Sequence, residues 1–286
     1  MEYFNPGDLN EAYEILMKYG DAAIPVAGST FFMGHREELF DEVDAVVNIK
    51  RLGLSYIRLE KGRLCIGATT TLAELHRTGL TAKGPFRIFA ETVRELKIME
   101  VRNAATIGGE VCIAGEVDMP TTLLAYDADI VIGSRNGTRT VSMSEFHKGY
   151  LKNALQTGEM VIEVQVPEPG RRTGGGFAKF ERTAADLPIV NAAVRLTLGR
   201  GDRCSDARVA VGAATVSGIP QRADAAEKVL LDGTLDDERI RKAAAASNSI
   251  ECVNDFRASA ELRTLWVECA VEDAIRKALT HAGEEK

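Results

Sequence analysis

The sequence predicts an α+β protein with two domains. Segments with the period of helices and segments with the period of strands are grouped unevenly along the chain, which favours α+β over a doubly wound sheet. The 286 residues are more than one average domain contains. A stretch rich in Gly, Pro and Arg, PEPGRRTGGGF from Pro167 to Phe177, interrupts the periodic segments. We therefore expect a first domain over residues 1–170 and a second over 171–286.

The first half of the chain begins with a predicted helix from Pro6 to Gly20, which Asp8 caps and Gly20 ends. A second helix is expected from Thr71 to Thr78, where Glu74 is placed for a capping box. Phe86 to Val101 has the pattern of one continuous helix. Short apolar runs predict strands at Ala22–Val26, Asp44–Lys50, Gly62–Thr70, Ile130–Ile132 and Met160–Val166.

The second half of the chain starts with strands and ends with helices. Alternating apolar residues predict strands at Asn191–Leu198 and Ala207–Thr215. Helical periodicity follows over Asp224–Leu231, Asp236–Ser247 and Ser259–Ala282. We find no convincing internal repeat.

Composition and charge narrow the classes of partner. A net charge of −7 argues against nucleic acid and anionic membranes as principal partners. Apolar runs are far shorter than the roughly 18 residues of a membrane-spanning helix, so no membrane insertion is expected. The first residues, MEYFNPGDLNEAYEIL, lack the basic and apolar regions of a signal peptide. These features predict a cytoplasmic protein.

The cysteines and histidines form no metal-binding pattern. The five cysteines are widely spaced without a CxxC pair, as in reduced cytoplasmic proteins. Zinc and iron–sulfur sites need thiolates at short spacings. The four histidines likewise form no motif such as HExxH. We expect this chain to hold no metal of its own.

Two short turns share a composition that suits phosphate. VAGST, from Val26 to Thr30, and TIGGE, from Thr106 to Glu110, each follow apolar residues and combine glycine with a hydroxyl side chain. Glycine lets a ligand approach the main chain, and successive amides of such a turn form a nest for phosphate oxygens. Neither turn is a GxGxxG in a βαβ unit, so a Rossmann fold is not indicated. Ordinary turns with nothing bound are the alternative.

Several motifs, in order along nearly the whole chain, resemble one family. VAGST is similar to the family's AGGT or AGGS turn, and VRNAATIGGE is similar to its RNxATIGGN. GEVDMPTTLLAYDADIVI, FHKGYLKNAL and GEMVIEVQVP follow in the expected order. FAKFERTAADLPIVNAAV and DFRASAELRTLWVECAVEDAI resemble its C-terminal part. The family is that of the FAD-binding, or medium, subunits of molybdenum hydroxylases, which includes those of aerobic carbon monoxide dehydrogenase and xanthine dehydrogenase.

The resemblance implies a fold and a cofactor site. The fold is a two-part FAD-binding domain of the vanillyl-alcohol-oxidase/PCMH type, followed by a smaller C-terminal α/β domain. Asp118 would bond the ribose or adenosine side of a non-covalently bound FAD, Lys179 would lie near the flavin ring, and Ile162, in an edge strand, would pack beside adenine or flavin. The turns expected to wrap its diphosphate contain Val26, Ala27, Gly28, Ser29, Thr30, Phe31, Thr106, Ile107, Gly108, Gly109 and Glu110.

The residues themselves leave alternatives open at this site. Asp118 could be a cap or turn acid before Pro120, and Lys179 a solvated strand lysine. Ser29 replaces the family's usual second glycine, which a serine can do if its φ angle stays negative. Glu110 replaces the usual asparagine, and its carboxylate would repel a diphosphate unless it is aimed away.

The function implied by the resemblance is electron transfer within a complex. Substrate oxidation would occur at a molybdenum cofactor on a large subunit, and electrons would pass through [2Fe-2S] clusters on a small subunit to FAD here. NAD or a quinone would be the acceptor, and no side chain of this chain need act as acid, base or nucleophile. A self-sufficient FAD-dependent oxidase or reductase is the first alternative, and a non-catalytic nucleotide-binding or scaffolding protein is the second.

Overall fold

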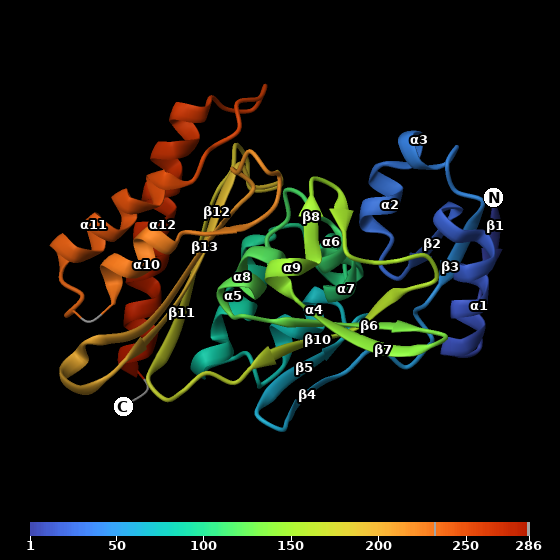
Figure 1. Ribbon diagram of the computed structural model, residues 1–286, viewed down its shortest axis with the longest axis horizontal. Coiled ribbons are helices and arrows are strands. Elements are labelled where there is room, and N and C mark those ends of the chain that lie inside the picture. The colour runs from blue at the N-terminus through green and yellow to red at the C-terminus, as the bar shows by residue number, and fades with distance from the viewer. Residues whose placement is uncertain (232, 285–286) are drawn as a thin grey trace.

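The computed structural model describes residues 1–231 and 233–284 and has three lobes that follow one another along the chain (Figure 1). The N-terminal lobe lies at one end of the long axis and the C-terminal lobe at the other. Helices and strands are both abundant and unevenly grouped, so the predicted α+β class is confirmed. Asp232 and the last two residues of the predicted second domain lie outside the described residues.

The first lobe is a small parallel sheet with helices, in strand order β1-β3-β2. Helix α1 begins where Asp8 accepts a hydrogen bond from the amide of Glu11 and ends at Gly20, as the sequence predicts. Its elements are β1 (Glu2–Phe4), α1 (Leu9–Tyr19), β2 (Ala23–Val26), α2 (Thr30–Gly34), α3 (Arg36–Leu39) and β3 (Ala45–Asn48).

The second lobe packs helices on an antiparallel sheet of strand order β4-β5-β10-β6-β7, with β8 and β9 as a separate hairpin. The Thr71–Glu74 capping box starts α4 as predicted. The elements are β4 (Ile57–Glu60), β5 (Arg63–Gly67), α4 (Leu72–Arg77), α5 (Arg87–Glu95), α6 (Met99–Ala104), α7 (Ile107–Cys112), α8 (Met119–Ala125), β6 (Asp129–Ser134), β7 (Gly137–Ser142), α9 (Met143–Phe146), β8 (His147–Gly149), β9 (Lys152–Asn153) and β10 (Met160–Pro167).

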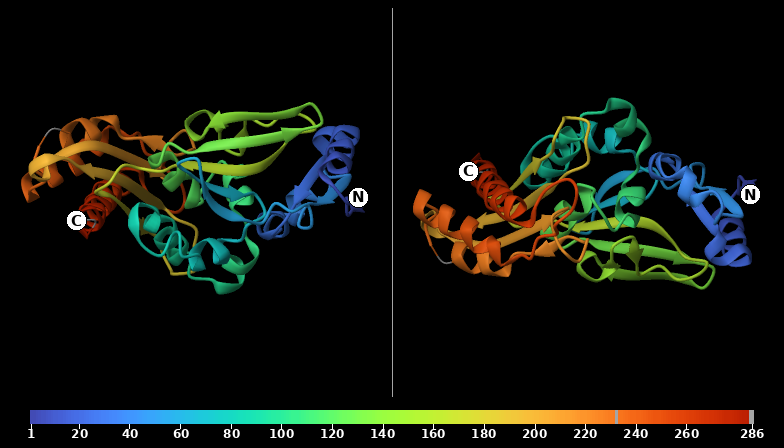
Figure 2. Two further views of the ribbon diagram at one scale, coloured as in Figure 1. Left: turned by 90° about the horizontal axis from the view of Figure 1, so that it is seen from below. Right: turned by 90° about the horizontal axis from the view of Figure 1, so that it is seen from above.

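The third lobe is an antiparallel sheet, in strand order β11-β12-β13-β14, covered by helices (Figure 2). Its elements are β11 (Thr173–Phe180), β12 (Val190–Leu198), β13 (Cys204–Gly212), β14 (Gln221–Arg222), α10 (Asp224–Leu230), α11 (Asp237–Ala246) and α12 (Ala260–Glu284). Helix α12 covers one face of the sheet, whereas α5 and α8 of the second lobe contact the other. The sheet therefore joins the two lobes through a shared core.

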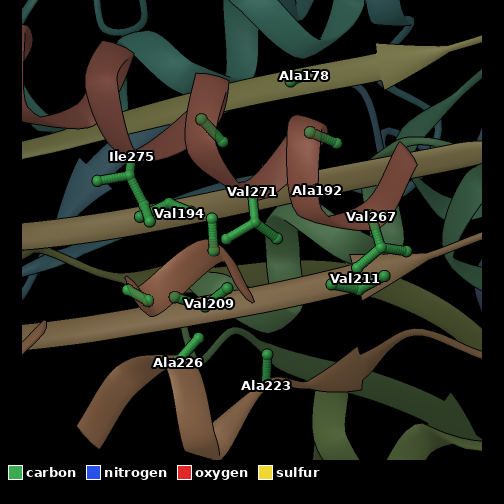
Figure 3. Close-up of a cluster of buried hydrophobic side chains, with 14 of the residues drawn as sticks. Ala178, Ala192, Val194, Val209, Val211, Ala223, Ala226, Val267, Val271 and Ile275 are labelled. Carbon is green, nitrogen blue, oxygen red and sulfur yellow. The ribbon is translucent and has the colours of Figure 1, made fainter. Parts of the chain in front are cut away.

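Small residues let α12 lie close to the sheet. Val271 and Ile275 point from the helix toward Val194 of β12, and Val267 points toward Val211 of β13 (Figure 3). Every one of these side chains is buried. The helix and the sheet form the hydrophobic core of the third lobe, because short aliphatic side chains fill the space between them.

A cluster of ion pairs around one aspartate adds to the contact between the second and third lobes. Asp127, just after α8, accepts hydrogen bonds from Arg195 at 2.9 Å, Arg208 at 3.2 Å and Arg222 at 3.0 Å. The three arginines come from β12, β13 and β14. The carboxylate thus fixes the end of α8 against three neighbouring strands.

Two predicted elements differ from the structure. Phe86 to Val101 is not one helix, because the backbone is extended at Leu96 and Ile98 and separates α5 from α6. The last three glycines of PEPGRRTGGGF, Gly174 to Gly176, belong to the buried strand β11 rather than to a linker. The connection between β10 and β11 is therefore only residues 168–172.

Among residues 1–231 and 233–284, no helix combines the length and apolar character needed to cross a membrane.

Gly176 tests how closely α12 packs on β11. A Cβ atom at Gly176 would lie 2.1 Å from the carbonyl oxygen of Ala274, so the helix would have to move. We expect Gly176→Ala to lower the free energy of unfolding by about 1–3 kcal/mol, as overpacked cores do. Urea denaturation measures the change. Gly170→Ala is the control, because Gly170 faces open space; equal midpoints for the two variants would contradict the packing described.

Candidate functional site

A cavity of about 390 Å³ lies between the first and second lobes. The turn between β2 and α2 forms one wall, and the start of α7 forms another. The β8–β9 hairpin and the start of β10 also line it. The cavity is lined by Ile24, Pro25, Val26, Ala27, Gly28, Ser29, Thr30, Phe31, Phe32, Leu39, Ile49, Ala68, Thr106, Gly108, Gly109, Cys112, Ile113, Leu151, Asn153, Leu155, Met160 and Val161.

The turn before α2 depends on the absence of a side chain at Gly28. A Cβ atom there would lie 2.0 Å from the carbonyl oxygen of Ala104, so only glycine allows this approach. Ser29, which follows, has a φ of 58°, in the left-handed region. The condition of a negative φ, under which a serine could replace the glycine, is not met: this serine adopts the conformation for which the family's usual glycine is suited.

The start of α7 uses its two glycines differently. Thr106 caps the helix by accepting a hydrogen bond from the amide of Gly109 at 3.3 Å. The amide of Gly108 donates to the carbonyl of Ala68 at 2.9 Å, and a Cβ atom on Gly108 would lie 2.7 Å from the same oxygen. Gly109 is exposed, and a Cβ there would meet only the Thr106 hydroxyl, at 3.3 Å. Gly108 thus serves packing, while Gly109 borders open space.

Most of the predicted turn residues line this cavity, and two predicted isoleucines do not. Ile107 is fully buried in the core of the second lobe. Ile162 lies in β10, which is a central strand of its sheet and not the predicted edge strand. The carbonyl of Ile162 accepts a hydrogen bond from the amide of Ala68, next to the cavity. Its neighbours Met160 and Val161 line the cavity instead.

Several lining residues were not predicted. Leu151, Asn153 and Leu155 come from the hairpin within the motif FHKGYLKNAL, which marked the segment but not the residues. Asn153 donates a hydrogen bond to the carbonyl of Cys112 at 3.0 Å and so fixes the hairpin to the end of α7. Burial raises the pKa of the Cys112 thiol to about 12. This thiol is therefore protonated and not nucleophilic at neutral pH.

Three predicted residues meet in a second, smaller pocket of about 40 Å³, where the second and third lobes touch. Glu110, Asp118 and Lys179 all line it. The Lys179 ammonium lies 3.2 Å from Asp118 and 2.7 Å from Glu181, and its side chain is only 2% exposed. Asn191 donates to Asp118 at 2.8 Å. Lys179 is thus no solvated strand lysine, and the Asp118 carboxylate faces Lys179 and Asn191 rather than capping α8.

Glu110 does not line the large cavity and lies on a different side of α7 from Gly109. The carboxylate would therefore not be in direct contact with a diphosphate bound in the large cavity. Enclosure by protein raises the pKa of Glu110 from its ordinary 4.5 to about 7, and the Asp118 carboxylate adds to the rise. The Met119 amide and Lys179 partly oppose it. Near neutral pH the carboxyl therefore exists in both protonation states.

Within the described part of the chain, no three His, Cys, Asp or Glu side chains come together as a metal site.

The chain matches two family models in sequence. The FAD binding domain in molybdopterin dehydrogenase matches residues 1–169, and the CO dehydrogenase flavoprotein C-terminal domain matches residues 176–278. The chain is therefore a member of the family of FAD-binding subunits of molybdenum hydroxylases, as its motifs predicted.

Individual relatives are similar to this chain over nearly its full length. The chain is 30% identical over 288 residues to the 6-hydroxypseudooxynicotine dehydrogenase complex subunit alpha of Paenarthrobacter nicotinovorans, covering 100% of this chain and 96% of the relative. It is 29% identical over 285 residues to the carbon monoxide dehydrogenase medium chain of Afipia carboxidovorans, covering 98% and 97%. A chain in the structure of reconstituted CO dehydrogenase from Oligotropha carboxidovorans superposes with a TM-score of 0.92 at 26% identity, covering 98% of each chain.

FAD fits the chemistry of the large cavity. The first amides of a helix lack acceptors within that helix, and α2 begins at the cavity with Thr30 and Phe31. These amides and nearby hydroxyls suit phosphate oxygens. The remaining wall is largely aliphatic and aromatic, which suits the apolar surfaces of a dinucleotide.

The raised pKa of Glu110 makes stability depend on pH. The folded chain binds this proton more tightly than the unfolded chain, so the contribution is fully present below about pH 4.5 and is lost as the pH rises to about 7. Glu110→Gln has no carboxyl to titrate at this position, so the variant does not lose this stability as the pH rises. We expect the free energy of unfolding of the variant, minus that of the wild type, to rise between pH 4.5 and 7 and to stay constant above, as urea titrations measure.

Glu116→Gln is the matched control, because Glu116 lines the same pocket but lies 3.7 Å from Arg257. Its difference from the wild type should show no such rise. A pH-independent difference for Glu110→Gln would contradict the assignment of the titrating group.

Proposed function

We propose that this chain is the FAD-binding electron-transfer subunit of a molybdenum hydroxylase complex, which passes electrons from iron–sulfur clusters of a partner through FAD to an external acceptor. The observation that carries the proposal is the meeting of two glycine turns, one from each lobe of the first domain, at a single cavity. Membership of the FAD-binding family supports FAD as the ligand. FAD suits the task because it can transfer electrons or a hydride.

The residues around the large cavity hold the diphosphate in this proposal. The donors are the amides and hydroxyls of the turn from Val26 to Phe31, together with Thr106 and Gly109. Gly108 keeps α7 close to Ala68, and its amide is already bonded there. Ile107 and Ile162 stand behind the cavity wall and support it. Glu110, Asp118 and Lys179 line the neighbouring pocket of about 40 Å³, on another side of α7, and in this proposal they border the site without contacting the cofactor.

Binding is non-covalent in this proposal. A covalent flavin linkage needs a nucleophilic side chain, and the predicted turns contain neither Cys nor His. The cysteine at the cavity wall, Cys112, has a thiol that stays protonated. Acid precipitation should therefore release the flavin.

The two domains have separate roles in this proposal. Residues 1–170 bind the cofactor, and residues 171–286 complete the surface for partners. The family models, which match residues 1–169 and 176–278, support this division. The smaller pocket lies where the two domains meet, so both contribute to its wall.

The partners follow from the names of the relatives. One relative is a subunit of a dehydrogenase complex and another is a medium chain, which supports assembly with other subunits. We assign the molybdenum cofactor to a large subunit and the [2Fe-2S] clusters to a small subunit, with NAD or a quinone as acceptor. The complex is assigned to the cytoplasm. No side chain of this chain is assigned as a catalytic acid, base or nucleophile.

Gly109→Val tests the cavity as the cofactor site. A branched side chain would occupy the open space at the start of α7, so we expect at least a roughly tenfold loss of FAD affinity, which is about 1.4 kcal/mol. Flavin absorbance after purification and the rise in melting temperature on adding FAD measure this loss. Gly79→Val is the matched control, because Gly79 is exposed with open space around it. Normal flavin content in Gly109→Val would refute the site.

Reconstitution separates an electron-transfer subunit from a self-sufficient flavoenzyme. We expect the FAD-loaded chain alone to oxidise no purine, nicotinate, aldehyde or CO, because it carries no assigned site for their chemistry. Adding molybdenum and iron–sulfur subunits should restore reduction of the acceptor on the same substrate panel. Turnover by the chain alone would favour the self-sufficient oxidase or reductase.

A further inference from the structure

Helix α7 separates two environments that differ in charge. Gly109 borders the large cavity, whereas Glu110, the next residue, points into the small pocket on the other side of the helix. The helix comprises only residues Ile107–Cys112, so the cavity and the pocket are separated by less than two turns of helix. A change of charge in the cavity therefore acts on Glu110 across a short stretch of protein, which screens it less than bulk water would.

The ionic network in the small pocket has more acids than bases. Lys179 is shared between Asp118 and Glu181. Glu116 and Asp186 lie at the same pocket, but each has its own arginine, Arg257 and Arg182 respectively. Glu110 adds a further carboxyl, for which the neighbouring donor is the amide of Met119. With every acid ionised, the Lys179 network would carry a net negative charge.

Glu110 is the member of this network that can exchange a proton. Asp118 accepts hydrogen bonds from both Lys179 and Asn191, which favour its charged form. Glu110 lacks such a pair of donors among the described residues, although its side chain is enclosed by protein. The pocket, at about 40 Å³, has room for water, which needs roughly 10–15 Å³. Water in it would connect the Glu110 carboxyl with solvent.

We propose that Glu110 is a proton-storing residue, whose carboxylate takes a proton from solvent when electrons reach the cofactor in the neighbouring cavity and returns it when they leave. The inference rests on the proposed function, because it requires FAD in that cavity. Added negative charge on the cofactor favours the neutral form of a nearby carboxyl, and the proton offsets that charge. No bond of Glu110 to the cofactor is needed. An asparagine, the family's usual residue at this position, could not store a proton.

The test is the pH dependence of the reduction potential of FAD bound to the full-length chain, measured by spectroelectrochemical titration from pH 5 to 9. A group that takes up a proton on reduction makes the potential fall more steeply with pH around its pKa. We expect a steeper fall near pH 7 for the wild type than for Glu110→Gln and Glu110→Asn. Glu116→Gln, whose acid is paired with Arg257, should follow the wild type.

The outcomes distinguish this inference from the proposed function. A chain that binds no FAD refutes the proposed function. A chain that binds FAD, with the same pH dependence in the wild type and both Glu110 variants, overturns the proton-storing role and leaves the function standing. If neither variant retains FAD, the wild type is compared with free FAD, and an equal slope at every pH overturns the role.

Discussion

One backbone contact sets the geometry of the candidate site. Gly28 lies so close to the peptide between Ala104 and Ala105 that a Cβ atom would come within 2.0 Å of the Ala104 oxygen. Thr106 follows at once and caps α7, so this contact fixes the distance between the two glycine turns. A larger residue at Gly28 would push the first lobe from the second and open the cavity that both turns line. The candidate site therefore depends on close approach of main chains more than on any side chain.

Local sequence signals predicted much of the fold, and they failed where contacts between distant segments determine the secondary structure. Asp8 and the Thr71–Glu74 box act over three residues, so their helices could be read directly. The break at Leu96 has no proline or glycine to mark it, and the amphipathic pattern continues across it. The glycines of β11 looked like a linker because glycine is common in turns. In the strand, Gly174 and Gly176 leave no room for a side chain because α12 packs on them, and Gly175 leaves none because Tyr126 and Ile88 pack on the other face.

The candidate site also contains residues that the sequence could predict and residues that it could not. The two turns could be predicted because glycine and hydroxyl residues carry their chemistry locally. Leu151 and Asn153 could not, since the hairpin reaches the cavity only through the fold. The ion pair of Asp118 with Lys179 joins residues 61 positions apart on two lobes, and no pattern in the sequence pairs them. Resemblance to the family supplied both residues but not their contact.

Glu110 is tolerated beside a proposed phosphate site because of helix geometry. Each residue of a helix is rotated by about 100° from the last, so the carboxyl after Gly109 leaves on another side. It then faces Asp118, which by itself would be unfavourable for both acids. The ammonium between Asp118 and Glu181 comes from β11 of the third lobe. The third lobe thus supplies the positive charge that compensates the acids of the second lobe, so the ion pairs beside α7 link the two lobes.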